Sequence, residues 1–172
     1  MDFIKFATDR YSVRKYKNEH LPKDVLNKIL LGGHIAPTGC NYQPQRILAI
    51  NTDDGMEKLK KCTHCHFEAP TALIIGYNKK ESWVKKYDGA MSAPVDSAIV
   101  ATHIMLTAHS LGVGSCMVMA YNPEILKKEF NIPDEIEVTM LMPMGYPHEE
   151  AKPLDMHEKV RPINETVFYE EF

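Results

Sequence analysis

The chain has 172 residues, of which 44% are hydrophobic and 25% are charged, and its formal net charge is -3. This length and hydrophobic share fit one globular domain over residues 1–172 and exclude disordered and fibrous classes. Acidic and basic residues are interspersed, so the chain offers no extended basic surface to nucleic acid or an anionic membrane. We therefore expect small-molecule partners.

The apolar runs and the cysteines favour a cytoplasmic protein. The N-terminus lacks a long apolar segment, and no later run approaches the length of a membrane span. The four cysteines, Cys40, Cys62, Cys65 and Cys116, are too few and too unevenly spaced for a disulfide framework. We therefore expect reduced thiols.

Near the N-terminus, a short helix over residues 2–8 is expected to lead into Arg10, Tyr11, Ser12, Val13 and Arg14. In an extended segment alternate residues point to one side, which places Arg10, Ser12 and Arg14 together. Two guanidinium groups and a hydroxyl suit an anion, because arginine matches phosphate oxygens bidentately. A solvated polar stretch is the alternative, since Arg-x-Ser-x-Arg is a short and common pattern.

An amphipathic helix is predicted after Pro22, which suits the first helical position. Its apolar residues recur at three-to-four spacing: Val25, Leu26, Ile29 and Leu30. We expect it to stop near Gly32 and Gly33.

Residues 36–45 form a loop, because Pro37 and Pro44 cannot donate to a helix or a sheet, and Gly39 and Asn41 reach positive φ cheaply. The polar groups of Thr38, Asn41 and Gln43 would then lie on a rigid corner suited to holding a ligand. A plain helix-to-strand connector is the alternative reading.

Strands are predicted at residues 47–50 and 72–77, with a helix capped by Thr52 between them. The following stretch, Cys62 to His66, looks like half of a zinc site. A structural zinc site needs four ligands, and no matching pair follows, so we expect no metal. A redox Cys-x-x-Cys lacks the usual strand-then-helix context, which leaves a local connector as the favoured reading.

The helix predicted from Ala93 to Leu111 is apolar on almost every face, so it must be buried in the core or against another subunit. Gly112 and Gly114 end it. A helix capped by Asn122, a strand over residues 138–142 closed by Pro143, and a Pro-containing tail from residue 148 complete the chain. Such a tail cannot easily bury itself, so we expect it to wrap around something.

Together, these segments resemble the nitroreductase family of FMN-dependent oxidoreductases over nearly the full length. The resemblance depends on the order and spacing of four features. They are residues 10–14, residues 36–44, the apolar helix into Leu111, Gly112, Val113 and Gly114, and Lys159, Val160 and Arg161.

The resemblance implies an α+β fold: an α/β/α sandwich with a central mixed sheet, assembled as an intertwined homodimer that shares two FMN sites. Arg10, Tyr11, Ser12 and Arg14 would hold the phosphate, ribityl and pyrimidine side of FMN, and Lys159 and Arg161 would close over the phosphate. Pro37, Thr38, Gly39 and Asn41 would come from the partner chain. Met119 and Ala120 would offer backbone N–H groups to the reactive edge of the ring.

The implied activity is NADH- or NADPH-dependent reduction of nitroaromatic, quinone or similar small electron acceptors by a ping-pong mechanism. Flavin supplies the hydride chemistry, so no catalytic acid or base side chain is expected. Trp83 and Tyr87 either line the acceptor pocket or pack over the second strand. The alternatives are a same-fold enzyme of reductive dehalogenation or flavin breakdown, a non-catalytic flavin-binding sensor, and a zinc-binding interaction protein that depends on Cys62 and Cys65.

Overall fold

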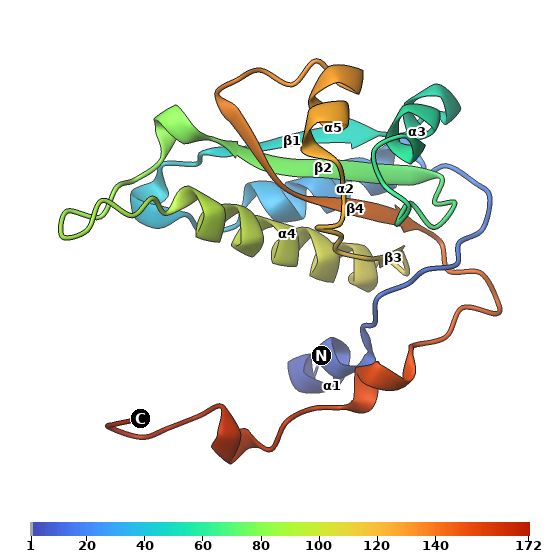
Figure 1. The fold of residues 1–172 in the computed structure, drawn as a ribbon. Helices are drawn as coiled ribbons and strands as arrows, with labels where there is room; N and C mark the ends of the chain where they lie inside the picture. Colours follow the sequence, from blue (N-terminus) through green and yellow to red (C-terminus); the bar gives the residue numbers. More distant parts are fainter. Residues whose placement is uncertain (1) are drawn as a thin grey trace.

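The structure, a computed structural model, describes residues 2–172, in which helices cover both faces of a four-stranded sheet (Figure 1). The α-helices are α1 (Phe3–Asp9), α2 (Lys23–His34), α3 (Asp53–Lys60), α4 (Ala93–Ser110) and α5 (Pro123–Glu129). The strands are β1 (Gln45–Ile50), β2 (Thr71–Asn78), β3 (Gly114–Ser115) and β4 (Ile136–Gly145). Within residues 2–172, no helix has the length and apolar character needed to cross a membrane.

The strand order is β1-β2-β4-β3, and each of these neighbouring pairs is antiparallel. The expected α+β class is confirmed, but the sheet within it is antiparallel and not mixed. A parallel contact does exist between Ser12 and Ser115, as an isolated bridge. The N-terminal segment meets β3 at this one residue pair, which is too short a contact to form a parallel strand.

The two faces of the sheet are buried under different helices, which produces the predicted three layers. Because side chains alternate along a strand, β2 sends Leu73 and Ile75 into the core cluster that contains buried residues of α2 and α4. Ala72 and Ile74 belong to a second cluster with buried residues of α3 and α5. The sheet is therefore covered on both faces.

The two glycines expected to end α2 lie inside it, since the helix continues to His34. A Cβ built on Gly32 would lie 2.0 Å from Thr107 Oγ1 of α4, and one on Gly33 would lie 2.6 Å from Ile104 Cγ1. These glycines permit close contact between two helices. The sequence pattern located the end of the helix to within two residues, but for the wrong reason.

Strand β4 runs through Pro143 to Gly145, whereas the proline was expected to close it. The Pro143 carbonyl accepts hydrogen bonds from the Cys116 N–H (3.1 Å) and the Tyr16 hydroxyl (3.1 Å). This side of β4 faces the two-residue strand β3, which forms few ladder bonds. The missing N–H is therefore tolerated near this edge.

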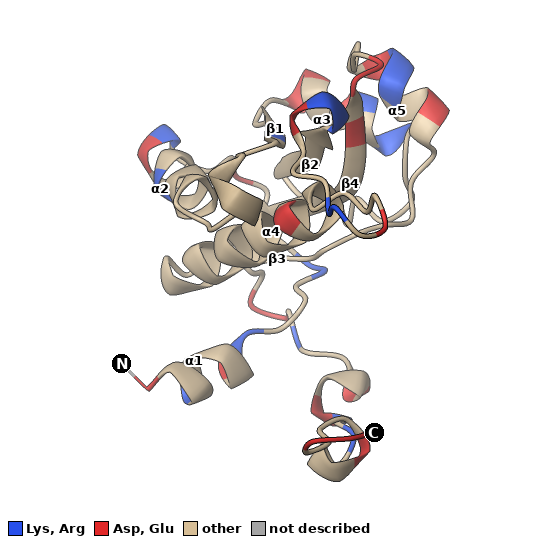
Figure 2. Cartoon of the chain, turned by 90° about the vertical axis from the view of Figure 1, so that its left-hand side faces the viewer, with Lys and Arg blue, Asp and Glu red and all other residues tan. Residues whose placement is uncertain are grey.

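Helix α4 is covered on one side only, although its composition predicted burial all round. Residues such as Val100, Ala101 and Ile104 are fully buried, but Val95 is 61% exposed. Asp96 is the single Asp, Glu, Lys or Arg in the helix, and the rest of it is drawn without charge in Figure 2. An apolar helix with one open face lacks a covering partner within residues 2–172.

Helix α1 and the tail after β4 project away from the α2 and α4 layer (Figures 1 and 2). The tail forms short 3-10 turns at Asp155–Glu158 and Ile163–Glu165. Both segments expose large apolar side chains. In α1 these are Phe3 and Ile4, and in the tail they include Met156, Val160, Ile163, Tyr169 and Phe172.

Candidate functional site

The segment from Arg10 to Arg14 is fixed to the sheet by its apolar members. Val13 is buried, donates its N–H to the Ser115 carbonyl (3.1 Å), and fills the space that a side chain at Gly114 would need. The buried Tyr16 hydroxyl donates to the Val13 carbonyl (2.6 Å), and burial raises its pKa far above the usual range. The hydroxyl therefore stays protonated as a structural donor.

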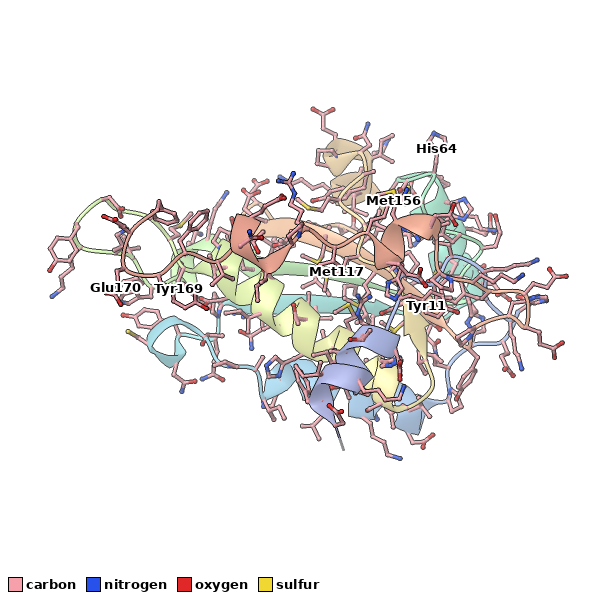
Figure 3. All side chains as sticks on the ribbon, turned by 90° about the horizontal axis from the view of Figure 1, so that it is seen from below. Tyr11, His64, Met117, Met156, Tyr169 and Glu170 are labelled. Carbon is pink, nitrogen blue, oxygen red and sulfur yellow. The ribbon has the colours of Figure 1, made fainter. Side chains whose placement is uncertain are left out.

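With Val13 turned inward, its polar neighbours face outward. A cleft of about 220 Å³ is lined by Arg10, Tyr11, Ser12, Arg14, Leu154, Met156 and His157. Its far wall belongs to the tail, and Figure 3 shows Tyr11 and Met156 in this part of the molecule. The tail is fastened there because the Tyr11 hydroxyl donates to the Ala151 carbonyl (3.3 Å) and His157 Nε2 contacts the Thr8 carbonyl (3.2 Å).

The cleft is cationic. Within residues 2–172, neither Arg10 nor Arg14 forms an ion pair with a carboxylate. Arg14 Nη1 donates to the Ser12 carbonyl (3.1 Å), and the guanidinium lies 5.8 Å from the centre of the Phe67 ring. Two guanidinium groups that are not neutralised, beside a hydroxyl, fit a phosphate or another anionic ligand.

Met119 and Ala120 follow β3, the strand that meets Ser12, and both are exposed. Their N–H groups donate to no protein acceptor in the described part of the chain. Their backbone is nevertheless held, because Val118 exchanges hydrogen bonds with Leu141 and the Thr63 hydroxyl donates to the Ala120 carbonyl (2.5 Å). Two free donors on a fixed backbone suit the polar edge of a ring.

The loop of residues 36–45 adopts a strained conformation. Cys40, Asn41 and Gln43 have φ values of 48°, 58° and 52°, which non-glycine residues rarely adopt. Buried Asp96 of α4 holds the loop by accepting from the Gly39 N–H and from the Ser92 hydroxyl, both at 2.8 Å. Strain of this kind persists only where the surroundings fix it, and it is common at functional sites.

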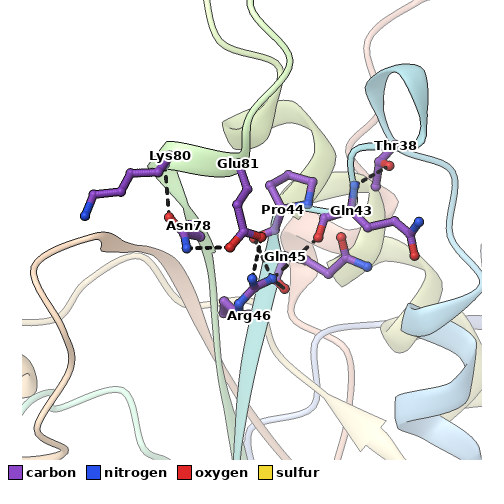
Figure 4. Close-up of polar contacts among 8 residues, drawn as sticks. All are labelled: Thr38, Gln43, Pro44, Gln45, Arg46, Asn78, Lys80 and Glu81. Carbon is purple, nitrogen blue, oxygen red and sulfur yellow. Dashed lines mark hydrogen bonds and ion pairs between the residues drawn. The ribbon is translucent and has the colours of Figure 1, made fainter.

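Further contacts fix the exit of the loop into β1 (Figure 4). The Gln43 N–H donates to Thr38 Oγ1 (3.0 Å), and the Asn78 N–H donates to the Pro44 carbonyl (2.8 Å). Arg46 pairs with Glu81, which also accepts from the Asn78 amide (2.8 Å). The loop is therefore a defined corner, as its prolines and glycine predicted.

The structure does not bring all the predicted site residues together within one chain. Arg10 to Arg14 meet β3, which begins just after the C-terminal end of α4, whereas Gly39 is bonded to the N-terminal turn of α4 (Figure 1). An 18-residue helix spans about 27 Å. The set formed by Pro37, Thr38, Gly39 and Asn41 is therefore separated from the arginine cleft of the same chain.

Lys159 and Arg161 follow the tail residues that line the cleft but do not line it themselves. Both are exposed on the tail and neither lines the cleft wall. Within residues 2–172, neither is ion-paired with a carboxylate.

The stretch around Cys62 and Cys65 is a connector between α3 and β2. The Cys62 thiol is buried and donates to the Lys58 carbonyl (3.3 Å), and all four cysteines are free. Among residues 2–172, no three His, Cys, Asp or Glu side chains are grouped so as to hold a metal ion.

Sequence reasoning did not assign a role at the site to Asp96, Thr63, Phe67 or His157. The signal for Asp96 was present, because it is a lone carboxylate in an otherwise apolar helix. The other three act through contacts that are distant in sequence, such as Thr63 with Ala120. Their local sequence gives no indication of these contacts.

Known proteins share this architecture. The model of the nitroreductase family matches residues 7–69 and 66–146. A crystal structure of a nitroreductase family protein from Clostridium difficile 630 superposes with a TM-score of 0.92 at 38% sequence identity, covering 100% of both chains. A structure described as an FMN-dependent nitroreductase from Clostridium difficile R20291 is 27% identical, with a TM-score of 0.77, over 98% of this chain and 99% of that one.

A curated relative from Thermus thermophilus, named NADH dehydrogenase, is 22% identical over 86% of this chain and 87% of its own length. The family match covers most of the described sheet and its helices. Since the family model accounts for more than half of the chain and a full-length structural relative shares over a third of its residues, this protein belongs to the nitroreductase family.

Proposed function

We propose that this member of the nitroreductase family, an FMN-dependent NAD(P)H oxidoreductase, reduces nitroaromatic, quinone or similar small acceptors by a ping-pong mechanism. The observation that carries the assignment is the cationic cleft at residues 10–14, which residues 63–67 link to the free N–H groups of Met119 and Ala120, because Phe67 contacts Arg14 and Thr63 bonds to Ala120. The cleft offers charge to a phosphate, and the two N–H groups offer donors to a polar ring.

The residues present fit FMN. Arg10 and Ser12 would hold the phosphate and ribityl chain, and Arg14 would lie toward the pyrimidine side. Lys159 and Arg161 would supply further cations. Bound FMN supplies the hydride chemistry, so the protein needs to bind and orient the ring and leave one face open.

Arg14 would favour the reduced state of the cofactor, and two backbone N–H groups would orient the ring. Reduction places negative charge on the pyrimidine side of flavin, and a nearby guanidinium such as Arg14 stabilises that charge. Arg14 can do so because its own charge is not neutralised by a carboxylate within residues 2–172. The N–H groups of Met119 and Ala120 would fix the ring at its other polar edge.

We further propose a homodimer in which each site uses both chains. The loop at Gly39 and the arginine cleft lie at opposite ends of α4, so one chain cannot form both walls of a site. The open apolar face at Val95 and the exposed apolar residues of the tail are surfaces that a second copy would cover. In a symmetric pair, the Gly39 loop of one chain would reach the cleft of the other.

The acceptor pocket would include the hairpin of residues 83–92. Its two arms meet at the isolated Val84–Met91 bridge, and Ser92 connects it to Asp96 and so to the Gly39 loop. Tyr87 is 96% exposed. The alternative in which Tyr87 packs over β2 is therefore wrong. Its exposure supports a place in the pocket of the partner chain.

One experiment tests the function. Purified protein should carry a yellow chromophore that is released as FMN and identified by mass spectrometry. Excess NADH or NADPH should bleach it without oxygen, and double-reciprocal plots against acceptor concentration should give parallel lines. Flavin that stays oxidised under these conditions would indicate a binding or sensor protein, and intersecting lines would contradict the ping-pong order.

A further inference from the structure

The loop of residues 62–69, between α3 and β2, is attached to the backbone that would meet the flavin ring. Thr63 is buried, donates its hydroxyl to the Ala120 carbonyl (2.5 Å), and accepts from the Cys65 N–H (2.9 Å). The Cys62 carbonyl accepts from the Asn122 N–H (2.8 Å). The loop and the Met119 turn therefore form one connected unit.

The same loop makes a strained turn that presents an aromatic ring. Phe67 and Glu68 have φ values of 53° and 48°, two successive left-handed residues without a glycine. His66 supports the turn, because its carbonyl accepts from the Ala69 N–H (3.0 Å) and its ring nitrogen accepts from the Glu68 N–H (3.2 Å). The result is a half-buried Phe67 ring facing the guanidinium of Arg14.

The contact between the Phe67 ring and the Arg14 guanidinium leaves the charge of Arg14 free to act on a ligand. A carboxylate would hold the guanidinium firmly but would cancel its charge. A ring face attracts the cation through its quadrupole and carries no net charge. Together with the Ser12 carbonyl at 3.1 Å, the ring restricts where the guanidinium can lie and leaves its charge available.

We propose that Phe67 is a positioning residue of the flavin site: it holds the Arg14 guanidinium in place without neutralising it, on a loop that Thr63 ties to the Ala120 backbone. The inference rests on the proposed function. A correctly placed Arg14 favours reduced FMN over oxidised FMN, because the reduced ring carries the negative charge.

The test compares Phe67→Leu, which removes the ring face, with Phe67→Tyr, which keeps it. In Phe67→Leu the preference of the protein for reduced over oxidised FMN should fall about two- to fivefold. For a two-electron couple this lowers the midpoint potential of bound FMN by about 9 to 21 mV. Phe67→Tyr should retain the wild-type potential.

A double-mutant cycle separates positioning from general loosening of the loop. In an Arg14→Met background, Phe67→Leu should cause no further change in potential, because the group it positions is absent. A flavin-independent measurement accompanies it: in the NMR spectrum of the flavin-free protein, the Arg14 Nε–H signal should lose its ring-current shift in Phe67→Leu and keep it in Phe67→Tyr.

The outcomes are distinguishable. Wild-type protein that binds no FMN overturns the proposed function and this inference with it. If wild type binds FMN but Phe67→Leu leaves the potential unchanged, the function stands and the positioning role is wrong. A shift that persists in the Arg14→Met background, or is equal in Phe67→Tyr, also overturns the positioning role.

Discussion

The two ends of helix α4 carry opposite kinds of structure. Beyond its C-terminal end, the cleft at Arg10 and Arg14 has guanidinium groups with no carboxylate partner in the described chain. In the segment that follows β3, the N–H groups of Met119 and Ala120 bond to no protein acceptor among residues 2–172. At its N-terminal end, the Gly39 loop is strained, and hydrogen bonds to Asp96 and to neighbouring segments hold its backbone. One end has unused binding capacity, and the other has its backbone fixed by hydrogen bonds, with the buried Gln45 Oε1 left without a partner in the described chain.

This difference suggests a division of roles. A site for a charged ligand must keep its cations free, so changes there should alter ligand affinity more than folding stability. A loop that forms only one side of a site in a neighbouring chain can use its hydrogen bonds to fix its own shape. Changes there should alter stability first and ligand binding second.

The largest effect is expected from removing the tail. Ending the chain after Ala151 keeps the Tyr11 contact but deletes one wall of the cleft, Lys159 and Arg161, and the exposed apolar residues of the tail. FMN should be lost and the dimer should dissociate together, because a ligand that binds only the dimer stabilises it. Sedimentation with flavin absorbance measures both.

Ending the chain after Pro162 is the control, since it retains Lys159 and Arg161. This longer form should keep more FMN than the shorter one. A monomer that carries flavin in either sample would contradict the shared-site proposal. It would mean that the cleft of one chain is enough to bind FMN.

Arg161→Ala should have the next largest effect. Loss of one charge-assisted hydrogen bond to phosphate weakens FMN binding by about 1.5 to 3 kcal/mol. The unfolding midpoint of the flavin-free protein should not change, because Arg161 is exposed. Fluorescence titration with FMN measures the affinity, and urea unfolding measures the stability.

Arg46→Ala is a matched control, because Arg46 pairs with Glu81 near the other end of α4. It should leave FMN affinity almost unaffected. If Arg161→Ala and Arg46→Ala bind FMN equally well, Arg161 does not belong to the site.

Asp96→Ala should show the reverse pattern. It leaves the Gly39 N–H and the Ser92 hydroxyl without their acceptor and should lower the free energy of unfolding by about 1 to 3 kcal/mol. Asp96→Asn, which keeps one acceptor oxygen, should lose less. Urea unfolding of the flavin-free protein measures this, and equal stability of all three proteins would mean that the loop holds its shape without Asp96.

The same contrast explains what the sequence could predict. The helix caps at Thr52 and Asn122, and the apolar runs of β2 and β4, depend on neighbouring residues, and the structure has them where they were expected. The role of Gly32 was missed because it depends on Thr107 in another helix. Local patterns identify elements but not the partners that they meet.

The candidate site also has one part that the sequence predicts from neighbouring residues and one part that depends on contacts distant in sequence. The grouping of Arg10, Ser12 and Arg14 in one cleft follows from alternation along an extended segment, and the structure has this grouping. The position of Phe67 against Arg14 depends on a left-handed turn built from non-glycine residues, for which the sequence carries no signal.

The smallest expected effect is on the alkylation rates of two cysteines, Cys40 before α4 and Cys116 after it. Cys40 lies exposed on the strained loop, whereas Cys116 is buried beside β4 and burial raises the pKa of its thiol. The thiolate is the reactive form, so in the folded protein at pH 8.5 Cys116 should react with iodoacetamide far more slowly than in the unfolded chain, whose cysteines have a pKa of about 8.5.

The sign of the pH dependence follows from the same shift. As the pH rises through about 8.5, the unfolded chain loses the Cys116 proton while the folded chain keeps it, so this thiol lowers folding stability with rising pH. Cys40 gives the second part of the prediction. Its alkylation should slow severalfold when FMN is added, because the proposed dimer brings the Gly39 loop of one chain to the arginine cleft of the other. Peptide mass spectrometry of timed samples follows each cysteine, with the urea-unfolded protein as control. If Cys40 reacts at the same rate with and without FMN, the Gly39 loop does not reach the cofactor, and the two ends of α4 serve separate purposes.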